Sequence, residues 1–312
     1  MYDSQTDKLI LIDQKQKLDQ KLKSLTYGAI EIRERSQAKY IYVHYRDEGK
    51  QQTNYVGEYS DELYQAILNN NIEAKKIKKA LRETIKKLKL MNYMSQTLSP
   101  SVEVNIDFAR KNMVDFIYKQ SVLEGIATTY ADTETIIEGG NINNMSAGDV
   151  HKIINLKHAW QFILNHDVIT ADTNYSLLCE INKLVIEGFY YNAGRVRSVP
   201  VSISGTAWKP PLPLESEIKD EMESILKSNL SVIEKAIEYI LYIMKKQIFI
   251  DGNKRTSIIF ANHLLVSHGL GIIVVPREKI ARFKDLLIAY YEGKDVIDIK
   301  QFLLNDCYYK LN

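Results

Sequence analysis

The 312-residue chain has few cysteines, no long apolar run and a net charge near zero. These absences argue against a disulfide framework, a membrane span and a strong general attraction to polyanions. Its two cysteines, Cys179 and Cys307, form neither a disulfide framework nor a metal-binding pattern, so we expect a reducing compartment. No apolar run approaches the roughly 18 residues of a membrane span, and no apolar segment follows the N-terminus. We therefore expect a cytoplasmic protein with no membrane partner. The formal net charge of +2 does not demand a nucleic-acid partner.

The composition is that of an ordinary globular protein, with 45% hydrophobic and 26% charged residues, which is enough to bury a core. The charge is uneven along the chain. Residues 1–98 contain 18 Lys/Arg and 13 Asp/Glu, a balance of +5, whereas the rest contains 41 − 18 = 23 and 39 − 13 = 26, a balance of −3. With an aperiodic, linker-like stretch around Ser99 and Pro100, this predicts an N-terminal module at 1–98 and a second domain at 99–312.

The N-terminal module combines helical and strand patterns. Residues 3–25 have the apolar spacing of an amphipathic helix. Residues 27–59 contain alternating runs around turn-like residues, which predicts a small antiparallel sheet of three strands. A helical run follows over 60–90, so we expect an α+β module.

The second helix of this module is strongly basic. Residues 73–90 contain eight basic and two acidic side chains beside the Tyr-rich sheet. Basic and aromatic surfaces can bind nucleic-acid phosphates and bases, but an apolar stripe of Ile77, Leu81, Ile85 and Leu88 shows that this helix also packs on something. From sequence we favour protein recognition or homodimerisation through the first helix over nucleic-acid binding.

The chain beyond about residue 103 is almost entirely helical in pattern, so we expect a mainly α protein. Two segments differ. In residues 197–213 apolar and polar residues alternate before three prolines, which predicts a β-hairpin. The second segment is the short apolar run 272–275, which ends at Pro276.

The stretch QIFIDGNKRT, residues 247–256, has the composition of an anion-binding turn between two helices. Gly252 can let consecutive N–H groups point into one concavity, and the following helix adds the positive end of its dipole. Arg255 can hold phosphate oxygens in a fork, and Asp251 can hold a magnesium ion. The alternative is a plain Gly-Asn turn with solvated Lys and Arg.

The same stretch resembles the signature of the Fic family, H-x-F-x-[DE]-G-N-[GK]-R-x-x-R. The matching residues are Phe249, Asp251, Gly252, Asn253, Lys254 and Arg255.

Three further segments resemble the Fic family in the same order. Residues 121–137, with the pair Glu124-Gly125, resemble the inhibitory helix that some members place before the core, so we expect that element near 117–130. Asp149-Val150, with Asn155 and Ala159, resembles the first core helix, and AGRVR at 193–197 resembles the motif before the hairpin. Together the matches cover about residues 104–300 and imply a helical Fic fold.

The resemblance implies a protein that binds ATP with Mg²⁺ and transfers AMP to a hydroxyl of an unknown target protein. Asp251 would hold the metal, Gly252, Asn253 and Lys254 would line the nucleotide site, and Arg255 would both bind phosphate and stabilise the transition state. Residues 199–208 would form a flap that adds the target as a strand through Val201, Ser202 and Ile203. An ordinary connecting hairpin is the alternative for that segment.

The first departure from the family pattern is Gln247, which stands where the family has a His acting as general base. An amide can orient a hydroxyl but cannot take its proton, and loss of a positioned base typically lowers a rate by about 10²–10⁴-fold. Neither His263, which we expect to be packed in the core, nor His268, at a helix end, offers a replacement. We therefore expect Gln247 to orient the hydroxyl, with activity weakened or lost.

Two other departures affect the phosphate end of the site. Ile258 replaces the second Arg that binds the γ-phosphate in many members, so Glu124 cannot make the usual inhibitory pairing, and Gln120 stands at the Ser/Thr position of the inhibitory motif. Glu124 can repel a γ-phosphate there, or have a capping or surface role. Lys254 and Thr256 are closer to the Doc branch, which is likened to a kinase. Three hypotheses follow: an AMP-transferring enzyme, an inactive nucleotide-binding regulator such as a toxin-neutralised module, and a Doc-like phosphotransferase.

Overall fold

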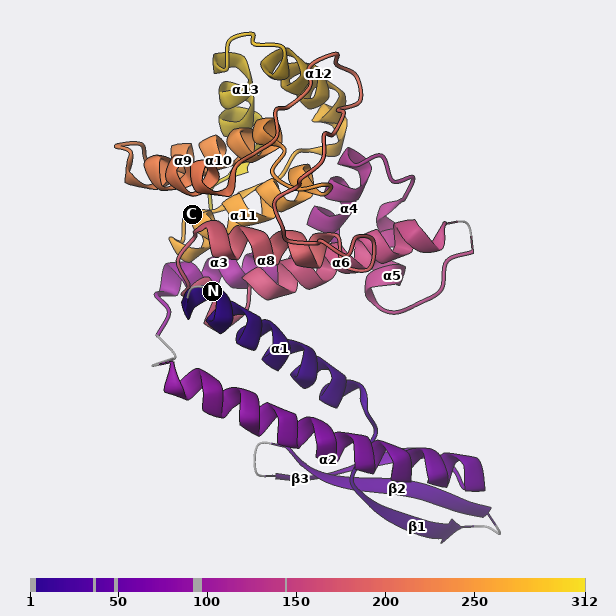
Figure 1. Cartoon of the computed structure of the whole chain (residues 1–312). Helices are drawn as coiled ribbons and strands as arrows, with labels where there is room; N and C mark the ends of the chain where they lie inside the picture. The colour runs from indigo at the N-terminus through magenta and orange to yellow at the C-terminus, as the bar shows by residue number, and fades with distance from the viewer. Residues whose placement is uncertain (1–3, 36–37, 48–49, 92–96, 144, 312) are drawn as a thin grey trace. The chain divides into compact units, whose positions relative to one another are not determined.

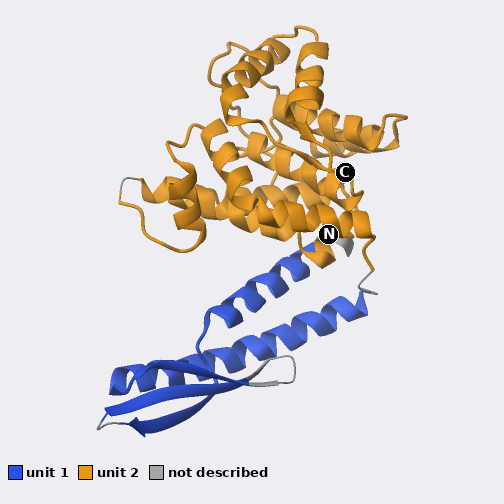
Figure 2. Ribbon diagram, turned by 180° about the vertical axis from the view of Figure 1, so that it is seen from behind, with its two compact units in different colours: residues 1–94 blue, residues 95–312 orange. Residues whose placement is uncertain are grey.

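A computed structural model describes residues 4–35, 38–47, 50–91, 97–143 and 145–311, and these divide into two compact units (Figure 2). Unit 1 is residues 1–94 and unit 2 is residues 95–312. The boundary expected from the sequence was at residue 98. Helix α3 begins at Pro100, because a proline at the first helical position lacks only an N–H that no intrahelical carbonyl would accept.

Unit 1 consists of two helices and one sheet (Figure 1). Helix α1 (Ser4–Ser24) is followed by strands β1 (Ala29–Arg35), β2 (Ala38–Asp47) and β3 (Lys50–Glu58), and then by the long helix α2 (Asp61–Leu90). The three strands form an antiparallel sheet in the order β1-β2-β3, as the alternation predicts. The side chain of Ser60 caps α2 by accepting a hydrogen bond from the N–H of Leu63 (3.1 Å).

The core of the sheet is small and lies on one face. Ile41 and Val43 of β2 are buried against Ile67 of α2, with Ile30 and Leu63 among the residues packed around them. The alternation along β2 places Tyr40 and Tyr42 on the opposite face, where the rings of Tyr40 and Tyr42 each contact that of Tyr55.

Unit 2 is mainly helical, as expected. Its described α-helices are α3 (Pro100–Lys111), α4 (Met113–Leu123), α5 (Tyr130–Ile137), α6 (Ala147–Ile163), α7 (His166–Ile169), α8 (Tyr175–Val185), α9 (Glu215–Lys227), α10 (Val232–Lys246), α11 (Asn253–Ser267), α12 (Ile280–Tyr291) and α13 (Ile297–Phe302). A short 3₁₀-helix, η1 (Arg277–Lys279), and a short π-helix, η2 (Leu303–Cys307), accompany them. The apolar run 272–275 supplies a short strand, β4 (Ile272–Ile273), which pairs with β5 (Tyr308–Tyr309).

Helix α11 is the centre of unit 2. Every residue from Arg255 to Val266 is buried, and the helix packs against α10, α8, α6 and α3 (Figure 1). Its buried polar side chains, such as Asn262 and His263, have hydrogen-bond partners inside the bundle, so the helix can be buried on all sides. The start of α11 is thereby held rigidly at the edge of the core.

The expected hairpin at 197–213 is not formed as paired strands. Residues 197–213, all of which the structure describes, contain no strand; they run as extended chain with a turn at Ser204 and Gly205. Pro200, Pro210 and Pro211 lack the N–H groups that a two-stranded ladder requires, which explains the difference.

No described helix is both long enough and apolar enough to cross a membrane.

Candidate functional site

The candidate site is the loop between α10 and α11, and left-handed backbone stands at both of its ends. Gln247 ends α10 with φ 48° and ψ 62°, and it is the one described non-glycine residue with positive φ. Gly252 begins α11 with φ 77°. A non-glycine residue in this region is uncommon and costs energy, so Gln247 is held there by its surroundings.

Gly252 is required by packing as well as by its backbone angles. A Cβ atom at this position would lie 2.7 Å from Cγ2 of Ile186 and 3.0 Å from Cγ1 of Val185. Because Gly252 has no side chain, it also cannot cap α11. The first N–H groups of that helix therefore have no intrahelical acceptor and no cap from this residue.

Two asparagines fix the loop. Asn253 donates to the carbonyl of Phe249 (2.8 Å) and accepts from its N–H (3.0 Å). Asn182 of α8 donates to the carbonyl of Asp251 (3.0 Å) and to the hydroxyl of Thr256 (3.1 Å) and accepts from the N–H of Gly194 (3.0 Å). Both side chains are buried, so the loop is bound to the core by satisfied hydrogen bonds.

The side chain of Gln247 is engaged within the loop. Its Nε2 donates to the carbonyl of Met244 (2.6 Å), and its Oε1 accepts from Nδ2 of Asn253 (3.1 Å). Both ends of the amide therefore have a protein partner.

Asp251 and Arg255 form the polar floor of the site. A guanidinium nitrogen of Arg255 lies 3.2 Å from a carboxylate oxygen of Asp251, whose other oxygen accepts from the N–H of Gly252 (2.6 Å). The side chain of Arg255 is 3% exposed and that of Asp251 is 38% exposed. Asp251 is thus open to a ligand, while Arg255 is buried beside it with only one of its nitrogens bonded to Asp251.

Glu124 completes the site from a distant part of the chain. It follows directly after α4, and its carboxylate oxygens lie 3.5 Å from Nε of Arg255 and 3.5 Å from Nζ of Lys254. Oε1 of Glu124 and Nε of Arg255 are both buried without a hydrogen-bond partner among the described atoms. The contact is therefore an ion pair without hydrogen bonding, which leaves donor and acceptor capacity unused beside the loop.

Gln120, which stands four residues before Glu124, is a core residue. This residue is 2% exposed, and its Oε1 accepts from Nε1 of Trp160 (2.8 Å). Gln120 therefore anchors α4 to α6 in the core.

Arg197, the last residue of AGRVR, joins the flap to the loop, a role that the sequence did not reveal. It is 2% exposed, and its guanidinium donates to the carbonyls of Gln247 (2.6 Å), Val199 (2.9 Å) and Pro211 (2.6 Å). Burial lowers the pKa of Arg197. One buried cation thus holds residues 199 and 211, on either side of the extended segment, against the C-terminal end of α10.

The outer part of the flap rests on α12. The ring of Trp208 stacks on that of Tyr291 with 5.6 Å between centroids, and Thr206 donates to a carboxylate oxygen of Glu292 (3.0 Å). Burial raises the pKa of Tyr291, and the nearby carboxylate of Glu124 adds to this. Ser202 is exposed and Val201 and Ile203 are partly exposed, so the expected target-binding segment is accessible.

The two histidines considered as replacement bases have other roles. His263 is fully buried; its ring nitrogens face the hydroxyl of Thr173 (2.9 Å) and the carbonyl of Val168 (3.0 Å), and burial lowers its pKa to about 4. Nδ1 of His268 lies 2.8 Å from the carbonyl of Leu264 at the end of α11. His263 is a core residue and His268 a helix-end residue, as expected from the sequence.

Comparisons with known proteins identify the class of this unit. Residues 172–265 match the family model described as Fic/DOC family. A Fic domain containing signaling protein of Bacteroides thetaiotaomicron aligns with a TM-score of 0.55 and 21% identity, covering 68% of this chain and 87% of that one. Fic-1 of C. elegans (aa134–508) aligns with a TM-score of 0.52 and 18% identity, covering 79% and 74%. Unit 2 therefore has the Fic fold.

More particularly, the chain contains a Fic/DOC family domain at residues 172–265. It is similar to the protein adenylyltransferases Fic of Drosophila willistoni and Drosophila persimilis, with 26% identity over 205 residues, or 61% of this chain. The alignments cover 39% and 38% of those relatives, so the chain spans less than half of their length. In unit 1, residues 9–65 match a domain of unknown function, DUF6788.

Proposed function

We propose that unit 2 binds Mg-ATP at the loop between α10 and α11 and transfers AMP to a hydroxyl of another protein, with a rate reduced because Gln247 replaces the base. The observation that carries this proposal is the convergence of Asp251, Lys254 and Arg255 at the uncapped start of α11. Distant similarity to protein adenylyltransferases supports the choice of AMP.

The phosphates would lie against the first turn of α11. The free N–H groups of that turn and the cations of Lys254 and Arg255 favour negative charge there. Because Arg255 is buried and fixed, it can stabilise the charge that develops on the α-phosphate without reorganising.

Asp251 suits a magnesium site. Mg²⁺ is often bound by one or two carboxylates, with phosphates and water completing the shell, and Asp251 is the half-exposed carboxylate of the loop. Among the described residues, no group of three or more acidic, His or Cys side chains could hold a metal by itself. When bound, the metal would neutralise phosphate charge.

Gln247 would orient the target hydroxyl. Its amide is held by the carbonyl of Met244 and by Asn253, so it has a fixed direction, but it has no site for a proton. The hydroxyl oxygen would form a bond to the α-phosphorus as the bond to the β-phosphate breaks, pyrophosphate would leave, and the hydroxyl proton would go to a phosphate oxygen of the substrate. The exposed edge of the flap at 201–203 would bind the target beside it by adding an extended segment.

Glu124 would reduce nucleotide binding. Its carboxylate occupies the contacts of Lys254 and Arg255 that phosphate oxygens would take. This inhibition differs from the usual one because the partners are the loop cations and not a second arginine, whose place Ile258 occupies inside the core.

The test is intact-mass spectrometry of the purified protein after incubation with Mg-ATP, alongside Gln247→His, Asp251→Ala and Arg255→Ala. A mass increase of one AMP that Asp251→Ala and Arg255→Ala abolish would support the enzyme. An AMP adduct only in Gln247→His would favour the regulator, whose nucleotide site is intact but lacks its base. A phosphate-sized adduct would favour Doc-like phosphotransfer, for which Lys254 at the phosphate end is the supporting residue. The absence of nucleotide binding by calorimetry would refute all three.

A further inference from the structure

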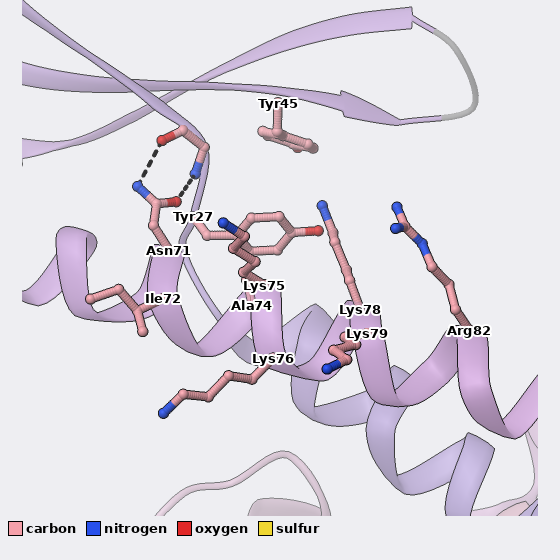
Figure 3. A pocket seen from close by; sticks show the side chains of 11 residues that line it. Tyr27, Tyr45, Asn71, Ile72, Ala74, Lys75, Lys76, Lys78, Lys79 and Arg82 are labelled. Carbon is pink, nitrogen blue, oxygen red and sulfur yellow. Dashed lines mark hydrogen bonds between the residues drawn. The ribbon is translucent and has the colours of Figure 1, made fainter.

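Unit 1 contains a cavity that the proposed function does not use. It has a volume of about 820 Å³ and lies between β2, the turn before β1 and the middle of α2 (Figure 3). Tyr27 and Tyr45 contribute aromatic rings, and Lys75, Lys78, Lys79 and Arg82 are among the residues that line it. All of its lining residues belong to unit 1, so the anion loop of unit 2 is not involved.

The fold creates this cavity where the sheet and α2 part. Ile41 and Val43 face α2 and are buried, and Tyr45 is the next residue of β2 on that face. Beside them Asn71 exchanges two hydrogen bonds with Gly28, donating to its carbonyl (3.0 Å) and accepting from its N–H (2.8 Å). Beyond this bridge the cavity opens between Tyr45 and the helix, and Figure 3 shows Lys78 beside the ring of Tyr27 in the space between strand and helix.

The cations of the cavity form one charged face. Lys75, Lys78, Lys79 and Arg82 have the i, i+3, i+4, i+7 spacing that places residues on one side of a helix, and all four are exposed. None of the lining residues is acidic. Among the side chains that the structure describes, no ion pair joins a carboxylate to any of these four cations, and Glu73 of the same helix pairs with Lys21 instead (2.6 Å).

The aromatic rings and the cations line the same cavity. Nζ of Lys78 lies 4.5 Å from the centroid of the Tyr27 ring, and Figure 3 shows Tyr45 opposite, across the cavity. A ligand that satisfies this site needs anions spaced along one side and flat apolar faces on the other. Unpaired bases on a phosphate backbone have both. An acidic peptide would leave the rings unused, and a duplex hides the base faces in its stack.

We propose that this cavity binds single-stranded nucleic acid, with phosphates along Lys75, Lys79 and Arg82 and a base against Tyr27 or Tyr45. This reverses the preference from sequence, because the structure places the basic face of α2 opposite aromatic rings and not simply in solvent.

The test is fluorescence anisotropy of the full chain with fluorescein-labelled 12-nucleotide RNA and DNA of the same mixed sequence, over a range of salt concentrations. The pocket variant is Lys75→Ala, Lys79→Ala and Arg82→Ala combined. The matched control removes three exposed cations of the same helix outside the cavity, Lys86→Ala, Lys87→Ala and Lys89→Ala. We expect the pocket variant to bind the single-stranded 12-mers roughly ten- to a hundredfold more weakly than the parent chain. The slope of the logarithm of the association constant against the logarithm of the salt concentration should become shallower by about 2, whereas the control variant should keep nearly the affinity and slope of the parent.

Aromatic stacking is tested separately. Tyr45→Ala should weaken binding roughly five- to a hundredfold, whereas Tyr45→Phe, which keeps the ring, should bind like the parent. Circular dichroism and the melting temperature of every variant establish that it is folded.

Three results would overturn the proposal. Equal losses in the pocket and control variants would mean a diffuse charge effect. Equal affinity for the 12-mer and its duplex would exclude base stacking, and competition by a poly-glutamate peptide at the same charge concentration would point to an acidic partner. Since no ATP is needed, a failure here leaves the proposed function untouched.

Discussion

Glu124→Gln removes the negative charge from the site and nearly preserves the shape of the side chain. Each carboxylate oxygen lies 3.5 Å from a cation, that of Lys254 or of Arg255. At an effective dielectric constant of about 20, each pair has a gross Coulomb energy of roughly 4–5 kcal/mol. Water screens Lys254, which is 32% exposed, and the charges also lose hydration. We therefore expect a net effect on phosphate binding of about 1–3 kcal/mol, a factor of roughly 5 to 150 in affinity.

The assay is isothermal titration calorimetry with ATP and Mg²⁺. The parent chain is compared with Glu124→Gln and with Glu138→Gln, which makes the same change at the exposed end of α5. We expect only Glu124→Gln to bind ATP more tightly. The gain should be smaller for AMP, since AMP has fewer phosphate charges to be repelled.

Unchanged ATP affinity in a folded Glu124→Gln protein would refute the reasoning. Weaker binding would refute it more strongly, because it would mean that Glu124 holds Arg255 in place for the ligand.

Three further predictions concern the scaffold of the site. Gly252→Ala should lower the free energy of unfolding by about 2–4 kcal/mol, because it combines a left-handed backbone with a Cβ 2.7 Å from Ile186. Gly139 has a similar φ and no atom within 4 Å of an added Cβ, so Gly139→Ala should lower the free energy of unfolding by only about 1–2 kcal/mol. Equal losses for the two variants in urea titrations would exclude the packing contribution. Asn182→Ala should cost about 2–3 kcal/mol, since it leaves buried partners of three hydrogen bonds unsatisfied, and a loss below about 0.5 kcal/mol would contradict this. The pKa of His263 is about 4 in the folded protein and 6.5 for a free histidine, so as the pH falls the unfolded chain takes up this proton first. Protonation therefore favours unfolding, and His263 should lower the free energy of unfolding by about 3 kcal/mol between pH 6.5 and 4. That part of the pH dependence should be absent from urea titrations of His263→Gln, and an unchanged slope would assign it to other groups.

Local patterns were enough to predict most of the elements. The alternation of 27–59 predicted three antiparallel strands, and the apolar spacing on either side predicted α1 and α2, because each signal depends on neighbours within a few residues. The prediction failed at 197–213, where alternating residues suggested a hairpin. There the prolines remove donors and Arg197 holds the chain ends instead.

For the site, the sequence alone determined which residue types the loop contains: a glycine that can adopt positive φ, an acidic residue, two cations, and an amide at the position where the Fic signature has a histidine. Only the tertiary structure decided what surrounds these groups. Glu124 meets Arg255 because α4 ends beside the start of α11, and Tyr45 faces Lys78 across a cavity because the sheet and α2 part after Val43. Such contacts join residues far apart in the chain. They depend on how whole helices and sheets pack, and no local pattern encodes that.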